Sequence, residues 1–78
     1  MSNLEKYEQT FIEIFDISKD QLKDLKYQGI VNWDSIGHMS LVAAIEDAFE
    51  IELDTDDIID FSSLEEGKVI LNKYGVRL

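Results

Sequence analysis

Ser35 and His38 are the side chains of this sequence whose types and spacing first suggest chemistry. A serine hydroxyl beside an imidazole pairs a nucleophile with its general base, and His38 is the single histidine of the chain. On a helix the two side chains are separated by about 60° around the axis, so they could reach each other. The sequence contains no G-x-S-x-G turn and no clear set of oxyanion donors, and 78 residues leave little room for a substrate cleft. We therefore predict that the protein is not an enzyme and that His38 is a packed or half-buried helix residue.

Asp34 and Ser35 together suggest a different use of the hydroxyl, as a point of attachment. Asp34 is a good N-cap residue, because its carboxylate can accept hydrogen bonds from the free N–H groups of a first helical turn. Ser35 then lies in that turn, near the positive end of the helix dipole, where a phosphate is favoured. An isolated Asp-Ser pair would indicate no more than a helix start.

The helix that begins here has two apolar faces. One is an ordinary core stripe at helical spacing, with His38 at its start, and it comprises Leu41, Val42, Ile45, Ala48 and Phe49. The other face carries Ile36, Met39 and Ala43 beside Ser35 and is bordered by acids. A helix that buries one face does not need these side chains, so we interpret them as a surface for partner proteins. The alternative is burial against the preceding connection, which concerns Ile36 most.

The first part of the chain is expected to support this junction from one side. Apolar residues at helical spacing predict a helix over about 4–15. The connection 16–33 is expected to hold a short helix after Ser18 and a turn in which Gly29 takes a positive φ. Its apolar residues should fold back over the helices, with Trp33 partly covered. A β-strand near Gly29 would have no obvious partner strand.

The last third of the chain predicts two more helices. Thr55 starts a short one that ends at residue 59 or 60, and overlapping capping boxes at Ser62 and Ser63 start the last one. Gly75 is a plausible residue to end it. The predicted fold class is all-α: a small four-helix bundle of three longer helices plus one short third helix, in a single domain of residues 1–78.

Charge and composition exclude several partners. The net charge is −10, and eleven acids but no Lys or Arg lie between positions 34 and 66. All seven basic residues lie outside that segment, and phosphate binding needs clustered basic side chains, so nucleic acid and anionic membrane surfaces are not expected to bind. The acidic surface either keeps the domain soluble or steers basic partners toward it.

Compartment and metal binding also follow from composition. The polar N-terminal residues show no signal peptide and no apolar run is long enough to span a membrane, which predicts a cytoplasmic protein. There is no cysteine for a disulfide or a metal site. The acidic run at 54–57 lacks the EF-hand spacing, so no dedicated metal site is predicted. A monomer is expected.

The segment from Asp34 to Phe49 resembles the signature of the acyl carrier proteins. In that family D-S-[LI] opens an amphipathic helix that ends in an acidic pair and Phe, as Asp34-Ser35-Ile36, Glu46-Asp47 and Phe49 do here. The similarity continues through residues 50–53, 56–58 and 61–64. The resemblance implies the same helical bundle and covalent 4′-phosphopantetheine on Ser35. It also implies a phosphopantetheinyl transferase, which uses coenzyme A, and acyl-loading and acyl-transferring enzymes as partners.

The resemblance assigns partner recognition to the same helix face and to later acids. The residues predicted for recognition are Ile36, Met39, Ala43, Glu46, Asp47, Asp56 and Asp57. The commonest fatty-acid carriers have acids where Gly37 and Ser40 stand here, so recognition near Ser35 should depend less on charge. The run W-D-S-I-G-H-M is more similar to freestanding carriers of specialised pathways.

The cargo pocket is predicted between the central and third helices. Its expected lining residues are Leu41, Ile45, Leu53, Ile58 and Phe61. Because Ile58 and Phe61 are bulky, we expect a short or polar cargo, or one that stays outside. The predicted function is transport of acyl intermediates as thioesters, in fatty-acid-related or specialised (polyketide- or polysaccharide-type) biosynthesis. An aminoacyl or D-alanyl carrier, and a helical adaptor of the same fold that is never modified, are the alternatives.

Overall fold

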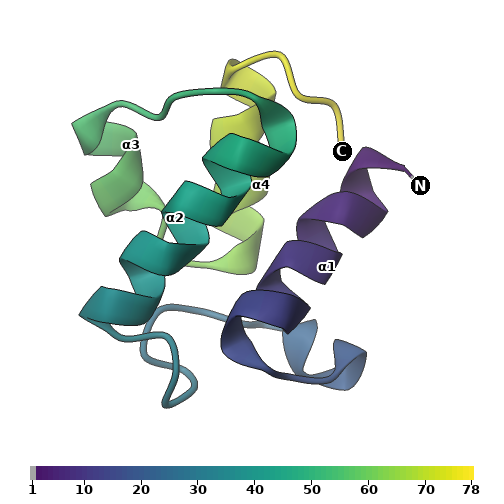
Figure 1. Cartoon of the computed structure of the whole chain (residues 1–78), viewed down its shortest axis with the longest axis vertical. Coiled ribbons are helices and arrows are strands. Elements are labelled where there is room, and N and C mark those ends of the chain that lie inside the picture. Colours follow the sequence, from purple (N-terminus) through teal and green to yellow (C-terminus); the bar gives the residue numbers. More distant parts are fainter. Residues whose placement is uncertain (1) are drawn as a thin grey trace.

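The computed structural model describes residues 2–78 and contains four α-helices and one 3-10 turn (Figure 1). The helices are α1 (Asn3–Phe15), α2 (Ser35–Phe49), α3 (Thr55–Asp60) and α4 (Leu64–Lys73), and the 3-10 turn η1 is Lys19–Leu22. Figure 1 shows the helices running alternately up and down, with the start of α1 and the C-terminal residues at the same end of the bundle. The predicted all-α bundle with a short third helix is confirmed.

Local hydrogen bonds explain where the helices begin. Ser2 and Glu5 form a capping box at the start of α1. Of the two overlapping boxes proposed for α4, the structure uses Ser63, whose hydroxyl accepts from the N–H of Glu66 at 3.0 Å. After α4, Gly75 takes the positive φ of 87° that favours glycine at this position.

The core is a run of aromatic rings between the helices. Tyr7, Phe11 and Phe15 of α1 are fully buried, and Phe11 meets Phe61 at a centroid distance of 6.1 Å. Trp33 stacks on Phe15 at 5.2 Å. Trp33 has no exposed surface, so the prediction that it is only partly covered is wrong: aromatic rings close over it.

The connection between α1 and α2 is tied to the start of α4 rather than lying free on the surface. The N–H of Tyr27 donates to the carbonyl of Ser62 at 2.8 Å, and the N–H of Leu64 donates to the carbonyl of Leu25 at 2.9 Å. These bonds flank an isolated antiparallel bridge, and residues 2–78 contain no β-strand. The pairing sets the position of Tyr27.

Two expectations for this connection are corrected. Gln28, not Gly29, takes the positive φ, at 63°. Gly29 is instead held close to Lys26, where a Cβ would lie 2.9 Å from the Lys26 carbonyl oxygen. Val31 does not fold back over the helices: 92% of its surface is exposed at the tip of the loop.

Candidate functional site

Ser35 is the first residue of α2, and its side chain is exposed. Asp34 caps the helix as predicted, because its Oδ1 accepts from the N–H of Gly37 at 2.8 Å. The hydroxyl therefore stands at the positive end of a 15-residue helix whose first turn is already held in place.

Gly37 allows the loop to approach this first turn closely. A Cβ at that position would overlap the carbonyl oxygen of Asn32. The side-chain amide of Asn32 in turn donates to the carbonyl of Phe15 at 2.8 Å, which ties the loop to the end of α1. The absence of an acid at position 37 thus has a packing cause, since no side chain fits there.

Tyr27 is a site residue that sequence reasoning did not identify. Its hydroxyl lies 3.2 Å from Ser35 Oγ. Seven residues lie between Tyr27 and Ser35 in the sequence, and no periodic pattern relates the two side chains. The contact depends on the backbone pairing of Tyr27 with Ser62.

His38 is half-buried, as predicted, and both of its ring nitrogens are occupied. The indole N–H of Trp33 donates to Nδ1 at 3.0 Å, and Nε2 lies 2.8 Å from the carbonyl oxygen of Ile58. An indole N–H can only donate and a carbonyl oxygen can only accept, so these contacts require Nδ1 as the acceptor and the proton on Nε2. Neither nitrogen is directed to Ser35 as a general base.

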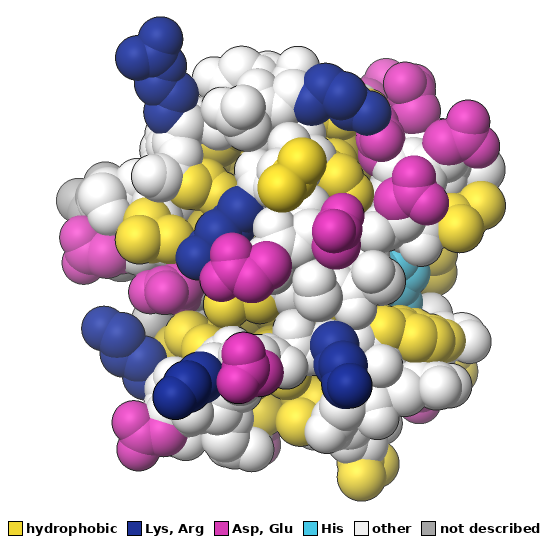
Figure 2. Space-filling view, turned by 180° about the vertical axis from the view of Figure 1, so that it is seen from behind, with side chains coloured by type: hydrophobic (Ala, Val, Ile, Leu, Met, Phe, Trp, Pro, Cys, Tyr) yellow, Lys and Arg dark blue, Asp and Glu magenta, His cyan; other side chains and the backbone are white. Residues whose placement is uncertain are grey.

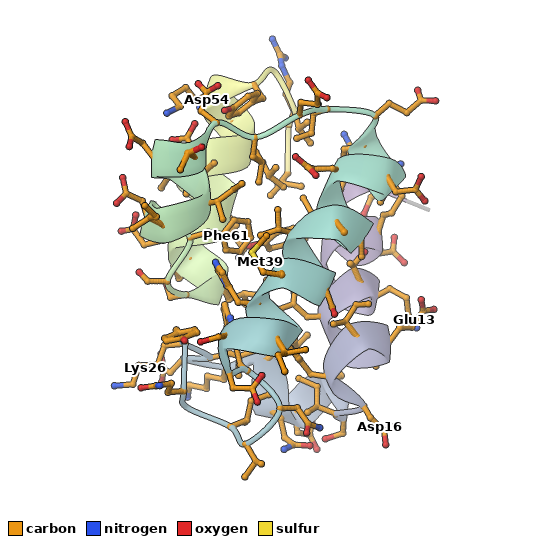
Figure 3. All side chains as sticks on the ribbon, turned by 60° about the vertical axis from the view of Figure 1, so that its left-hand side comes forward. Glu13, Asp16, Lys26, Met39, Asp54 and Phe61 are labelled. Carbon is orange, nitrogen blue, oxygen red and sulfur yellow. The ribbon has the colours of Figure 1, made fainter. Side chains whose placement is uncertain are left out.

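A cavity of about 310 Å³ opens beside Ser35, between α2 and α3. Figure 3 shows Met39 of α2 beside Phe61, which follows α3. The lining residues are Tyr27, Ser35, His38, Met39, Ile58, Ile59, Phe61 and Ser62. Of the five residues predicted for a pocket, only Ile58 and Phe61 line it. Leu41, Ile45 and Leu53 are instead buried in the hydrophobic core.

The apolar face beside Ser35 is open to solvent. Ile36 is 80% exposed and Met39 56%, and Ala43 is exposed too. Burial of Ile36 against the preceding connection is therefore not observed. Ile59 of α3 is exposed and lines the same cavity. The sequence did not predict this role, because a helix as short as α3 shows no apolar periodicity that separates the surroundings of Ile58 from those of Ile59.

The predicted acidic residues fall into two groups. Asp47 and Asp56 are exposed, and Figure 2 shows acidic side chains gathered at the α3 corner of the molecule, at the upper right. Glu46 is half-buried, and its carboxylate accepts from the N–H of Leu53 at 2.8 Å, which holds the link after α2. Glu46 therefore supports the fold as well as adding charge.

Asp57 departs from its predicted place at the surface: only 5% of it is exposed. Its carboxylate accepts from Lys73 Nζ at 2.5 Å and from the Tyr74 hydroxyl at 2.6 Å. The Lys73 hydrogen bond, followed by that of Tyr74, lowers the pKa of Asp57, while the bond to Asp57 raises the pKa values of Lys73 and Tyr74. This network joins α3 to the end of α4, and we leave Asp57 out of the surface for partners.

Comparison with known proteins supports the interpretation of this segment. Residues 33–66 match the family model described as the phosphopantetheine attachment site. The matched domain is the attachment site for covalent 4′-phosphopantetheine, and the match supports a carrier of the acyl carrier protein type. Domains of this kind are generally carriers without catalytic activity. No curated protein and no solved structure matched the chain.

Within residues 2–78, no group of three or more His, Cys, Asp or Glu side chains is arranged to hold a metal ion. None of the helices in the same range is both long and apolar enough to cross a bilayer.

Proposed function

We propose that the protein carries acyl intermediates as thioesters on a 4′-phosphopantetheine arm attached to Ser35 Oγ. The observation that carries this proposal is the exposed hydroxyl at the capped start of α2, inside the segment that matches the attachment-site family. Attachment joins Ser35 Oγ to the phosphorus of the pantetheine phosphate of coenzyme A. The pyrophosphate P–O bond breaks and adenosine 3′,5′-bisphosphate leaves.

The residues around Ser35 fit this group. The first-turn N–H groups and the helix dipole favour a phosphodiester there. The chain has no cysteine, so the arm supplies the thiol that forms the thioester. The hydroxyl proton must leave to a base of the phosphopantetheinyl transferase, because both ring nitrogens of His38 are already engaged.

The proposed docking surface for the transferase and for acyl-handling enzymes is the exposed face around Ser35. It comprises Ile36, Met39, Ala43, Asp47 and Asp56. Exposed apolar side chains next to acids suit partners that present an apolar patch bordered by basic residues. The net charge of −10 would accelerate the approach of such partners.

The cargo proposed is a short or polar acyl group, or one held outside the protein, in fatty-acid-related or specialised biosynthesis. The cavity of about 310 Å³ is at the lower end of the roughly 300–1,000 Å³ of small-molecule sites. Protein-to-acyl NMR contacts with a long chain sequestered in solution would contradict this part of the proposal.

The proposal is tested by intact mass after incubation with coenzyme A, Mg²⁺ and a broad-specificity transferase. We expect the wild type and the control S40A, which changes another exposed serine of α2, to gain one phosphopantetheine, and S35A to gain none. A wild type that gains no mass would overturn the proposal in favour of an unmodified adaptor. If the holo protein is loaded by an adenylating amino-acid ligase rather than by an acyl-carrier synthetase, the protein is an aminoacyl carrier instead of an acyl carrier.

A further inference from the structure

We propose that Tyr27 is a positioning residue of the Ser35 site, whose hydroxyl binds first Ser35 Oγ and, after attachment, an oxygen of the phosphodiester. This inference rests on the proposed function. Its starting observation is the 3.2 Å separation between the Tyr27 hydroxyl and Ser35 Oγ, two atoms whose residues line the same cavity.

Tyr27 is held rigidly although it lies in a connection between helices. Its backbone N–H donates to Ser62, just before α4. Its ring packs edge-on against Trp33, at 6.4 Å and 86°, and against His38, at 5.6 Å and 78°. Trp33 and His38 are themselves joined by a hydrogen bond. A phenol positioned in this way loses little further freedom when it binds a ligand atom.

Attachment of the arm changes which of the two groups can donate. Before it, either hydroxyl can donate to the other. Once Ser35 Oγ is esterified it has no proton, so the phenol O–H becomes the donor. A phosphodiester oxygen carries negative charge and is a stronger acceptor than a serine hydroxyl. The contact therefore strengthens on modification.

The position of Tyr27 also gives this contact a direction. The first-turn N–H groups of α2 point along the helix axis, whereas Tyr27 approaches Ser35 from the wall of the cavity. A phosphodiester bound on the Tyr27 side would be held at the cavity mouth, next to Met39 and Ile58. The hydroxyl of Tyr27 thus favours arm conformations that begin at the cavity over those directed into solvent.

The test compares the holo forms of the wild type, Y27F and the control Y74F. Y27F keeps the ring that packs on Trp33 and His38 and removes one partly exposed hydroxyl. Y74F removes a hydroxyl that bonds to Asp57, away from Ser35. The readouts are the ³¹P chemical shift of the phosphodiester, NOEs between the ring at position 27 and the methyl groups of the arm, and the urea midpoint of unfolding.

We expect Y27F to shift the ³¹P resonance and to lose most of the NOE intensity, with the urea midpoint unchanged. Y74F should lower the urea midpoint and leave both NMR signals as in the wild type. If Y27F takes up the arm but keeps the wild-type ³¹P shift and NOEs, the role of Tyr27 is excluded while the proposed function stands. If the wild type itself gains no mass, both fail together.

Discussion

The indole N–H of Trp33 donates to Nδ1 of His38 at 3.0 Å, and the opposite nitrogen of that imidazole bonds to the carbonyl of Ile58 at 2.8 Å. One ring thus connects the loop before α2, the first turns of α2 and the short helix α3. These are the elements that surround Ser35 and its cavity. In residues 2–78, no buried side-chain nitrogen or oxygen lacks a hydrogen-bond partner. Near the site, the His38 ring contributes to this by bonding to both the Trp33 indole and the Ile58 carbonyl.

Replacing His38 by Phe should destabilise the protein although it keeps a ring of similar size. The Trp33 N–H would lose its acceptor within the core, at a cost of about 1–3 kcal/mol. Urea unfolding measures the loss, with S40A as a control on the exposed side of α2. A double-mutant cycle with W33F should show coupling between the two residues. Strict additivity would contradict a direct Trp33–His38 bond.

Asp34→Ala should lower stability by about 1 kcal/mol, because α2 loses the side-chain cap on the N–H of Gly37. The effect should be local as well as global. Hydrogen exchange at the Gly37 amide should accelerate more than exchange at amides in the middle of α2. D47A, which removes an exposed acid from the same helix, is the matched control and should leave Gly37 protected. Equal exchange in both variants would argue against the cap.

Gly67→Ala should be destabilising, although alanine is the better helix former by about 1 kcal/mol. The added Cβ would overlap the Tyr7 hydroxyl and the Phe61 ring. Such overpacking costs about 1–3 kcal/mol and outweighs the helix propensity. Thermal unfolding checks the sign. N72A, at an exposed position of the same helix, is the control and should be neutral or slightly stabilising. A stabilised G67A would contradict the prediction and show that Tyr7 and Phe61 can shift to accommodate the added Cβ.

Asp57→Asn should show a stability loss that depends on pH. The Lys73 and Tyr74 hydrogen bonds lower the pKa of Asp57 in the folded state, so the ionised carboxylate favours folding. This contribution is complete above the unfolded pKa of about 3.9 and is lost as the pH falls through the lower folded value. Urea midpoints of wild type and D57N should therefore differ most near neutral pH and converge as the pH falls below the lowered folded pKa of Asp57. A constant difference across this range would contradict the assignment.

Ile36→Ala should reduce modification by the transferase without changing stability. The side chain is 80% exposed in the free protein, so its truncation leaves the core intact. If Ile36 docks into a partner pocket, the loss is about 1–2 kcal/mol, or roughly 5–30-fold in kcat/KM. The control is V69A, an exposed apolar residue on α4. Equal rates for I36A and wild type would remove Ile36 from the docking surface.

The features that the sequence determined by itself are those built from neighbouring residues. The Asp34 cap and the core stripe of α2 involve side chains within one or a few helical turns, so spacing alone predicts them. At the start of α4, spacing left Ser62 and Ser63 as alternative caps, and the structure uses Ser63. The prediction of a bundle with a short third helix follows from the same local signals.

Only the tertiary structure decided which groups meet around Ser35. The Tyr27 hydroxyl, the Trp33–His38 bond and the burial of Asp57 join residues on different elements. Such contacts depend on how the connection 16–33 folds back and on how α3 meets α4. Neither arrangement can be predicted from the spacing of apolar residues along one helix. For the same reason the cavity lies beside Ser35 rather than among the central core residues: helix packing, not residue type, decides where space is left.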